Sequence, residues 1–82
     1  EWYRRAADQG YIIAQRNLAT LYLSGDGIEQ DKVQALAWYN IVAGNGNAMD
    51  IRRRDALRSE LSETQLRQSE ALASELSTRL PN

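Results

Sequence analysis

The side chains that enzymes use as nucleophiles, bases and metal ligands are scarce in this chain. Its 82 residues include no cysteine and no histidine. Their absence removes thiolate nucleophiles, imidazole bases and the commonest ligands of transition metals. What remains is single serine, aspartate and glutamate residues, none spaced to form a nucleophile and base pair. We therefore predict that the chain is not an enzyme and that it holds no metal and no cofactor.

Two patterns in residues 25–31 match ligand-binding loops only in part. The Gly25-x-Gly27 pair lacks the third glycine, the lysine and the preceding strand of a phosphate-binding loop. The acidic residues Asp26, Glu29 and Asp31 lack the spacing of a calcium loop, and Asp31 is placed to cap the helix that follows. We interpret this segment as a turn between two helices.

Arginine is the remaining residue type that could recognise a ligand. Nine of the ten basic residues are arginines, Lys32 being the exception, yet the net charge is only −1. The run Arg52-Arg53-Arg54 lies among acidic residues and has no aromatic residue interleaved with it, so we predict no nucleic-acid binding. Other arginines stand four residues after an acid, a spacing typical of ion pairs on a solvated helix face. These pairs are Glu1–Arg5, Asp50–Arg54, Glu63–Arg67 and Glu75–Arg79. Arg16, Arg52 and Arg53 have no acid at that spacing.

The spacing of apolar residues predicts an all-α chain that positions these arginines. In the predicted helix 11–24, Ala14, Leu18, Leu21 and Tyr22 have the spacing of one buried face. Asp31 predicts the start of the next helix, and Ser62 with Gln65 predicts a capping box at the start of the last one. The five predicted helices span about residues 1–9, 11–24, 31–43, 48–60 and 62–80. No apolar run approaches the roughly 20 residues that cross a bilayer, so we predict no membrane insertion.

The chain repeats itself after 36 residues. Trp2-Tyr3 recurs as Trp38-Tyr39. The same shift aligns three further pairs, namely Ala7 with Ala43, Gly10 with Gly46 and Leu21 with Leu57. A fixed period of this length indicates stacked helix pairs, each of which buries its apolar face only against its neighbours.

This pattern resembles the Sel-one-like repeat (SLR), a relative of the tetratricopeptide repeat with a longer loop between its helices. The resemblance covers residues 1–46 and implies an α-α superhelix, a solenoid of antiparallel helix pairs. Beyond residue 46 it weakens, because Asp50 and Arg54 stand where Ala14 and Leu18 stood one repeat earlier. We predict one domain over residues 1–82, the C-terminal part of a longer array. Residues 1–10 would end a truncated repeat, 11–46 form a complete one, and 47–82 form a degenerate repeat plus a capping helix.

The resemblance also implies where partners bind. The recurring Trp-Tyr pairs could stack on a ligand, but at a fixed repeat position they more readily fill the space between helices. In families of this kind the first helix of each pair lines the concave surface that holds partners. The residues placed there are Ile13, Arg16, Thr20, Leu23, Met49, Arg52, Arg53 and Ala56. Arginines flanked by aliphatic residues suit an acidic peptide, although such arginines can also be merely solvated.

Two functions follow from this sequence, and they belong to different classes. The first is a protein–protein interaction scaffold or adaptor that binds partner segments along a helix-lined groove. The alternative is a structural cap that ends a longer array and binds nothing itself, and a regulatory module attached to an enzyme is a third interpretation. Self-association through the N-terminal helix is a further expectation, since about three repeats are usually needed for a robust solenoid. The partner's identity and the cellular compartment stay open.

Overall fold

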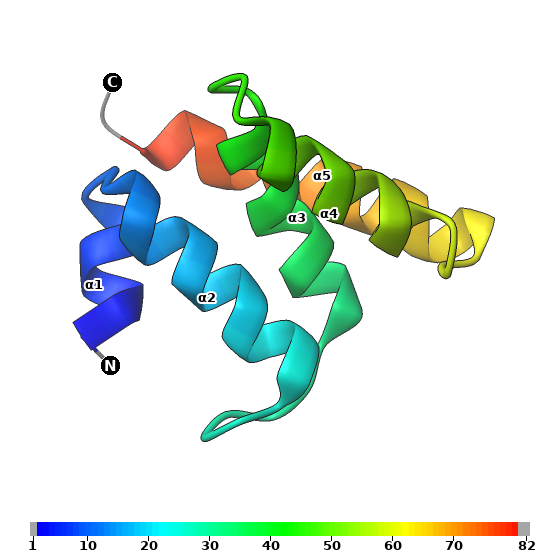
Figure 1. Ribbon diagram of the computed structural model, residues 1–82, viewed down its shortest axis with the longest axis horizontal. Coiled ribbons are helices and arrows are strands. Elements are labelled where there is room, and N and C mark those ends of the chain that lie inside the picture. Colours follow the sequence, from blue (N-terminus) through cyan, green and yellow to red (C-terminus); the bar gives the residue numbers. More distant parts are fainter. Residues whose placement is uncertain (1, 81–82) are drawn as a thin grey trace.

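A computed structural model describes residues 2–80, with side chains from residue 4 onward. Within these residues the chain forms the predicted all-α architecture. The helices are α1 (Trp2–Asp8), α2 (Ile12–Ser24), α3 (Lys32–Ala43), α4 (Ala48–Arg58) and α5 (Glu63–Arg79). Figure 1 shows them joined by short turns, with α3 in the middle of the molecule. None of the described helices is both long and apolar enough to cross a membrane.

Local signals in the sequence account for most of the helix ends. The Asp31 side chain accepts a hydrogen bond from the Gln34 backbone N–H at 3.1 Å and so caps α3 as predicted. The predicted capping box begins α5: the Gln65 N–H donates to Ser62 Oγ at 3.1 Å, and the Ser62 N–H donates to Gln65 Oε1 at 3.0 Å. Helix α4 is shorter than predicted, since it ends at Arg58 and not at residue 60.

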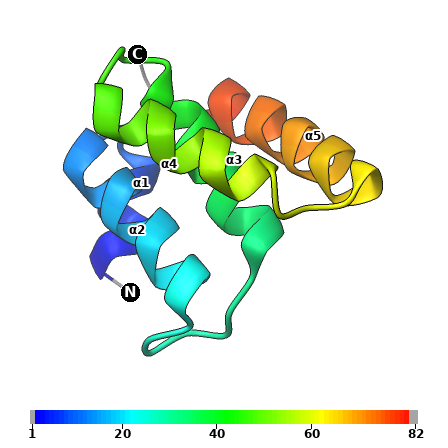
Figure 2. The same cartoon turned by 45° about the vertical axis from the view of Figure 1, so that its right-hand side comes forward.

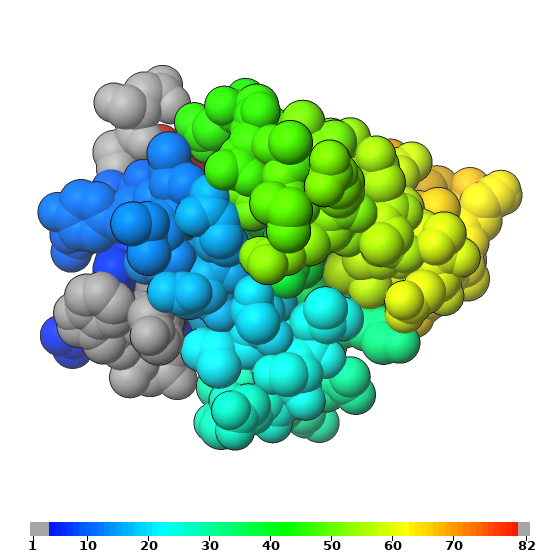
Figure 3. All heavy atoms as spheres, viewed as in Figure 1, coloured from blue at the N-terminus to red at the C-terminus, as the bar shows by residue number. Residues whose placement is uncertain are grey.

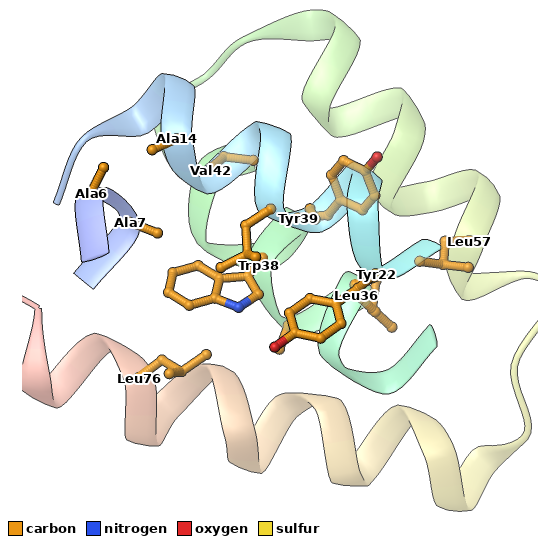
Figure 4. Packing of buried hydrophobic residues seen from close by; sticks show 14 residues of the cluster. Ala6, Ala7, Ala14, Tyr22, Leu36, Trp38, Tyr39, Val42, Leu57 and Leu76 are labelled. Atoms are coloured by element: carbon orange, nitrogen blue, oxygen red, sulfur yellow. The ribbon is translucent and has the colours of Figure 1, made fainter. Parts of the chain in front are cut away.

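Helix α3 is the centre of the fold and contacts α2, α4 and α5. Its adjacent aromatic residues face different neighbours. The Trp38 indole lies on the side of α3 that faces Leu76 of α5 (Figure 4), while the Tyr39 hydroxyl lies 3.1 Å from Thr20 Oγ1 of α2. Both aromatic side chains are buried, with exposed fractions of 3% and 2%. Trp38 and Tyr39 therefore fill the space between helices, whereas the side chains of Trp2 and Tyr3 lie outside the described part.

The buried face of α2 differs in part from the prediction. Ala14, Leu18 and Tyr22 are buried as expected, but Leu21 is half-exposed. Gln15 and Ala19 are buried with them. The reason is that α2 packs between α1 and α3, so its buried surface is wider than one stripe. The Gln15 amide is satisfied there, since its Nε2 donates to the carbonyl oxygen of Ala7 at 3.2 Å.

Candidate functional site

Helices α2 and α4 occupy equivalent positions in successive helix pairs and lie next to each other on one face of the molecule. Figures 1 and 2 show both on the same side, and Figure 3 shows their side chains forming a continuous surface. The shift of 36 residues places Ile13 opposite Met49 and Arg16 opposite Arg52 in this pair of helices. All eight of the predicted contact residues lie on α2 or α4. We call the surface formed by these eight residues the α2–α4 face.

The two helices are joined by an ion pair between Arg16 and Asp50. Arg16 Nε donates to Asp50 Oδ1 at 2.8 Å, and Arg16 Nη2 donates to Asp50 Oδ2 at 2.7 Å. This is the bidentate geometry in which arginine binds a carboxylate most strongly. The Asp50 side chain is fully buried, and that of Arg16 keeps 27% of its surface exposed. Both charges are therefore held at the point where the two repeats meet.

The first turn of α4 holds the Asp50 carboxylate in place. The Asn47 side chain caps the helix by accepting the backbone N–H of Met49 at 2.9 Å and that of Asp50 at 3.2 Å. The hydrogen bonds from Arg16 hold the pKa of Asp50 below its usual value, against the opposing effect of burial. The same hydrogen bonds raise the pKa of Arg16. The carboxylate thus stays ionised although it is buried.

This pair corrects the ion pair that the sequence suggested within α4. Asp50 does not bind Arg54, because its carboxylate faces α2 and not the solvated side of its own helix. Arg54 instead bonds to Asp55, at 3.0 Å from its Nε. The repeat indicates that Asp50 pairs with another part of the chain. Asp50 stands at the position of the buried Ala14, and a buried carboxylate needs a partner. That partner is Arg16, 34 residues away.

The other predicted contact residues divide into two groups. Leu23 packs against the core, whereas Thr20 is exposed and its Oγ1 donates to the Arg16 carbonyl oxygen at 3.1 Å. Ile13 and Met49 project into solvent, with exposed fractions of 70% and 50%. The remaining three side chains of the face, Arg52, Arg53 and Ala56, are also exposed.

The exposed arginines of the α2–α4 face are free of acidic partners in the part of the chain that has described side chains. The described ion pairs involve other basic residues, namely Arg16, Lys32, Arg54 and Arg58. Arg52 Nη1 lies 3.9 Å from Met49 Sδ, so the guanidinium lies beside an exposed apolar side chain. Arg53 makes no ion pair within residues 4–80, although its charge adds to the lowering of the pKa of Asp50.

Two hollows of the surface are lined by none of the eight residues of this face. One of about 350 Å³ is bordered by Ile12, Ile41 and Leu80, where the ends of three helices meet. Another, of about 390 Å³, lies beside the loop before α3 and includes Tyr22 and Ile28. Within the described residues no three acidic side chains come together as a metal site. The exposed residues of the α2–α4 face form an open surface, which suits a protein segment better than an enclosed small molecule.

Comparison with known proteins decides the family. A family model for the Sel1 repeat matches residues 1–11 and 12–47. The chain belongs to the Sel1 repeat family. None of the curated proteins matches the sequence. This Sel1-repeat chain is similar to a crystal structure of a protective antigen present in uropathogenic Escherichia coli strains, which displays an SLR fold.

That likeness confirms the family and the fold that the sequence predicted. The two structures share 35% sequence identity with a TM-score of 0.88, over 95% of this chain. The chain spans 17% of the length of the antigen. The Sel1 repeat and the SLR fold indicate a repeat scaffold for protein–protein interaction. Such scaffolds are typically non-enzymatic, as the sequence predicts here.

Proposed function

We propose that this Sel1-repeat chain binds segments of other proteins along the α2–α4 face. One observation supports this most: Ile13 and Met49 are exposed in equivalent positions of adjacent repeats, on a face whose exposed arginines have no acidic partner among the described side chains. Among the described side chains, the other large apolar residues that are exposed are Tyr11 and Ile12, the N-cap and the first residue of the same helix as Ile13. Exposed apolar residues accompanied by charged ones are typical of protein-binding surfaces.

The preferred partner is an acidic segment. Around Ile13 and Met49, the charge of Asp50 is neutralised by Arg16, and Arg52 and Arg53 remain positive. A negative segment would therefore be attracted to this surface and oriented by it. This preference is local to the surface, since the net charge of the whole chain is only −1.

Affinity capture with two matched alanine variants tests the location of the surface. Ala56 on α4 and Ala71 on α5 are both exposed, but only Ala56 lies on the α2–α4 face. We expect Ala56→Asp to lose bound proteins and Ala71→Asp to retain them, as judged by quantitative mass spectrometry of the captured material. Equal retention by both variants would contradict the proposal.

A structural cap is the second candidate, and the composition of α5 favours it. Helix α5 exposes mainly charged and small polar side chains, including Glu63, Arg67, Glu70 and Glu75. Such a surface suits the end of a repeat array, because terminal repeats need a polar outer face. A longer protein that binds partners which this chain alone does not bind would favour the cap over the scaffold.

Self-association through α1 is a weaker proposal. The described side chains that α1 exposes are Arg4, Arg5 and Asp8, which are charged and contribute little apolar area. A dimer would give its helix pairs additional neighbours, and packing between neighbouring units is what stabilises a repeat fold. Sedimentation across a wide concentration range would detect the dimer, and a monomer throughout would exclude it.

A further inference from the structure

Arg16 and Arg52 occupy the same position in successive repeats but differ in their ion pairing. Two donor groups of the Arg16 guanidinium are bound to Asp50, whose side chain has no exposed surface. A partner's carboxylate could displace Asp50 only by leaving a buried charge unpaired, which is strongly unfavourable. The Arg16 guanidinium therefore joins α2 to α4 and is not available to a partner.

Arg52 is available to a partner. It makes no ion pair in the described part of the chain, and its guanidinium lies beside the sulfur of Met49. The next residue, Arg53, is also exposed and makes no ion pair with the acidic side chains that the structure describes. Two positive side chains thus follow an exposed apolar residue by about one turn of α4.

We propose that the α2–α4 face binds an acidic segment of another protein that carries one aliphatic anchor. The anchor packs between Ile13 and Met49, and carboxylates of the segment bind Arg52 and Arg53. Arg16 is a positioning residue that acts through Asp50 and does not touch the partner. This assignment rests on the proposed function and names the partner class for that same surface.

The geometry of α4 sets the spacing within the segment. One helical turn rises about 5.4 Å, and an extended chain advances about 3.3 Å per residue. The first carboxylate therefore follows or precedes the anchor by about two residues. Charge-assisted hydrogen bonds to these arginines would add to the apolar contact.

A synthetic peptide tests the proposal. It has about eight residues and contains one leucine and two aspartates at this spacing. Binding of the labelled peptide is measured by fluorescence anisotropy at several salt concentrations. One control peptide has asparagine in place of both aspartates, and another has glycine in place of leucine. We expect each control peptide to bind about 10-fold or more weakly, the range expected for losing charged hydrogen bonds or an anchor.

Three protein variants separate the roles of the arginines. Arg52→Gln with Arg53→Gln should weaken binding about 10-fold or more and flatten its salt dependence. Arg67→Gln, an exposed arginine of α5 outside the face, should change neither quantity. Arg16→Lys should lower the melting temperature, because lysine cannot reproduce the bidentate contact, yet leave the salt dependence of the folded protein unchanged.

Several results would overturn the proposal. One is equal binding of the aspartate and asparagine peptides, and another is a flattened salt dependence in Arg16→Lys. A dimer of the wild-type chain that the Arg52 and Arg53 variant abolishes would assign the surface to a second copy. If the peptide fails to bind while Ala56→Asp still loses captured proteins, this partner class is wrong and the proposed function stands. If Ala56→Asp also retains every captured protein, the proposed function fails as well.

Discussion

Asp50 carries a full charge in a place where the preceding repeat has an alanine. The Arg16 guanidinium makes this tolerable, because two short hydrogen bonds replace the water that the carboxylate loses. The two partners are not equivalent, however. Asp50 is fully buried, whereas Arg16 retains access to water. Removal of either partner should therefore have a different consequence.

We expect Arg16→Ala to destabilise the fold more than Asp50→Ala. The first change leaves a buried carboxylate without a partner and should cost about 3 kcal/mol. The second leaves a guanidinium that can turn to water, and alanine already occupies the equivalent position 14, so about 1 kcal/mol is expected. Urea unfolding of both variants measures the difference, and equal losses would contradict it.

The same carboxylate predicts a dependence of stability on pH. Its pKa in the folded chain lies below the unfolded value of about 3.9, so the ionised form stabilises the fold. This contribution is complete well above the unfolded pKa and is lost as the pH falls through the folded pKa. We expect the wild-type chain to be more stable than Asp50→Asn at pH 7 by about 2 kcal/mol, with the gap narrowing below about pH 4. A gap that stays constant to acid pH would contradict this.

At the scale of elements, the ends of the helices depend on a few local hydrogen bonds. The chain between α4 and α5 turns within residues 59–62, and the Ser62–Gln65 capping box begins α5 there. The turn between α2 and α3 is longer and uses Gly25 with a positive φ of 75°. A side chain at that position would be strained and would also approach Gln30 to 3.1 Å. These local features determine where each helix starts or stops.

We expect Ser62→Ala to cost about 1 kcal/mol, because it removes the acceptor for the Gln65 N–H at the start of α5. Ser74→Ala is the matched control, since Ser74 is exposed inside the same helix. Alanine has the higher helix propensity, so this control should be neutral or slightly stabilising. Thermal unfolding followed by circular dichroism compares the two, and equal melting temperatures would exclude a role for the cap.

The whole molecule depends on α3, which three other helices contact. Its side chains Leu36, Trp38, Tyr39 and Val42 are all buried. A chain of this size is expected to be stable by only about 4–12 kcal/mol. The loss of one large side chain from α3 would remove a substantial part of this stability. It should therefore affect all the helices that pack on α3.

We expect Trp38→Ala to cost about 3–5 kcal/mol, a large part of the total stability of the chain. Ile13→Ala is the control, since the Ile13 side chain is 70% exposed and its loss should leave the fold almost unchanged. Urea unfolding followed by far-ultraviolet circular dichroism measures the stability of both variants. A Trp38→Ala variant as stable as the wild-type chain would mean that the tryptophan is not needed for packing.

The sequence alone determined the five helices, the caps of α3 and α5, and the repeat that relates the helix pairs. The helices and caps depend on residues that are close together in the chain. The repeat is a period of the sequence itself and can be recognised without the fold. The packing arrangement was decided only by the tertiary structure. It placed Gln15 rather than Leu21 in the core, because α2 has neighbours on two sides. It also paired Arg16 with Asp50 across 34 residues, a choice that depends on how two helices meet. That pairing distinguishes two arginines that have the same place in the repeat.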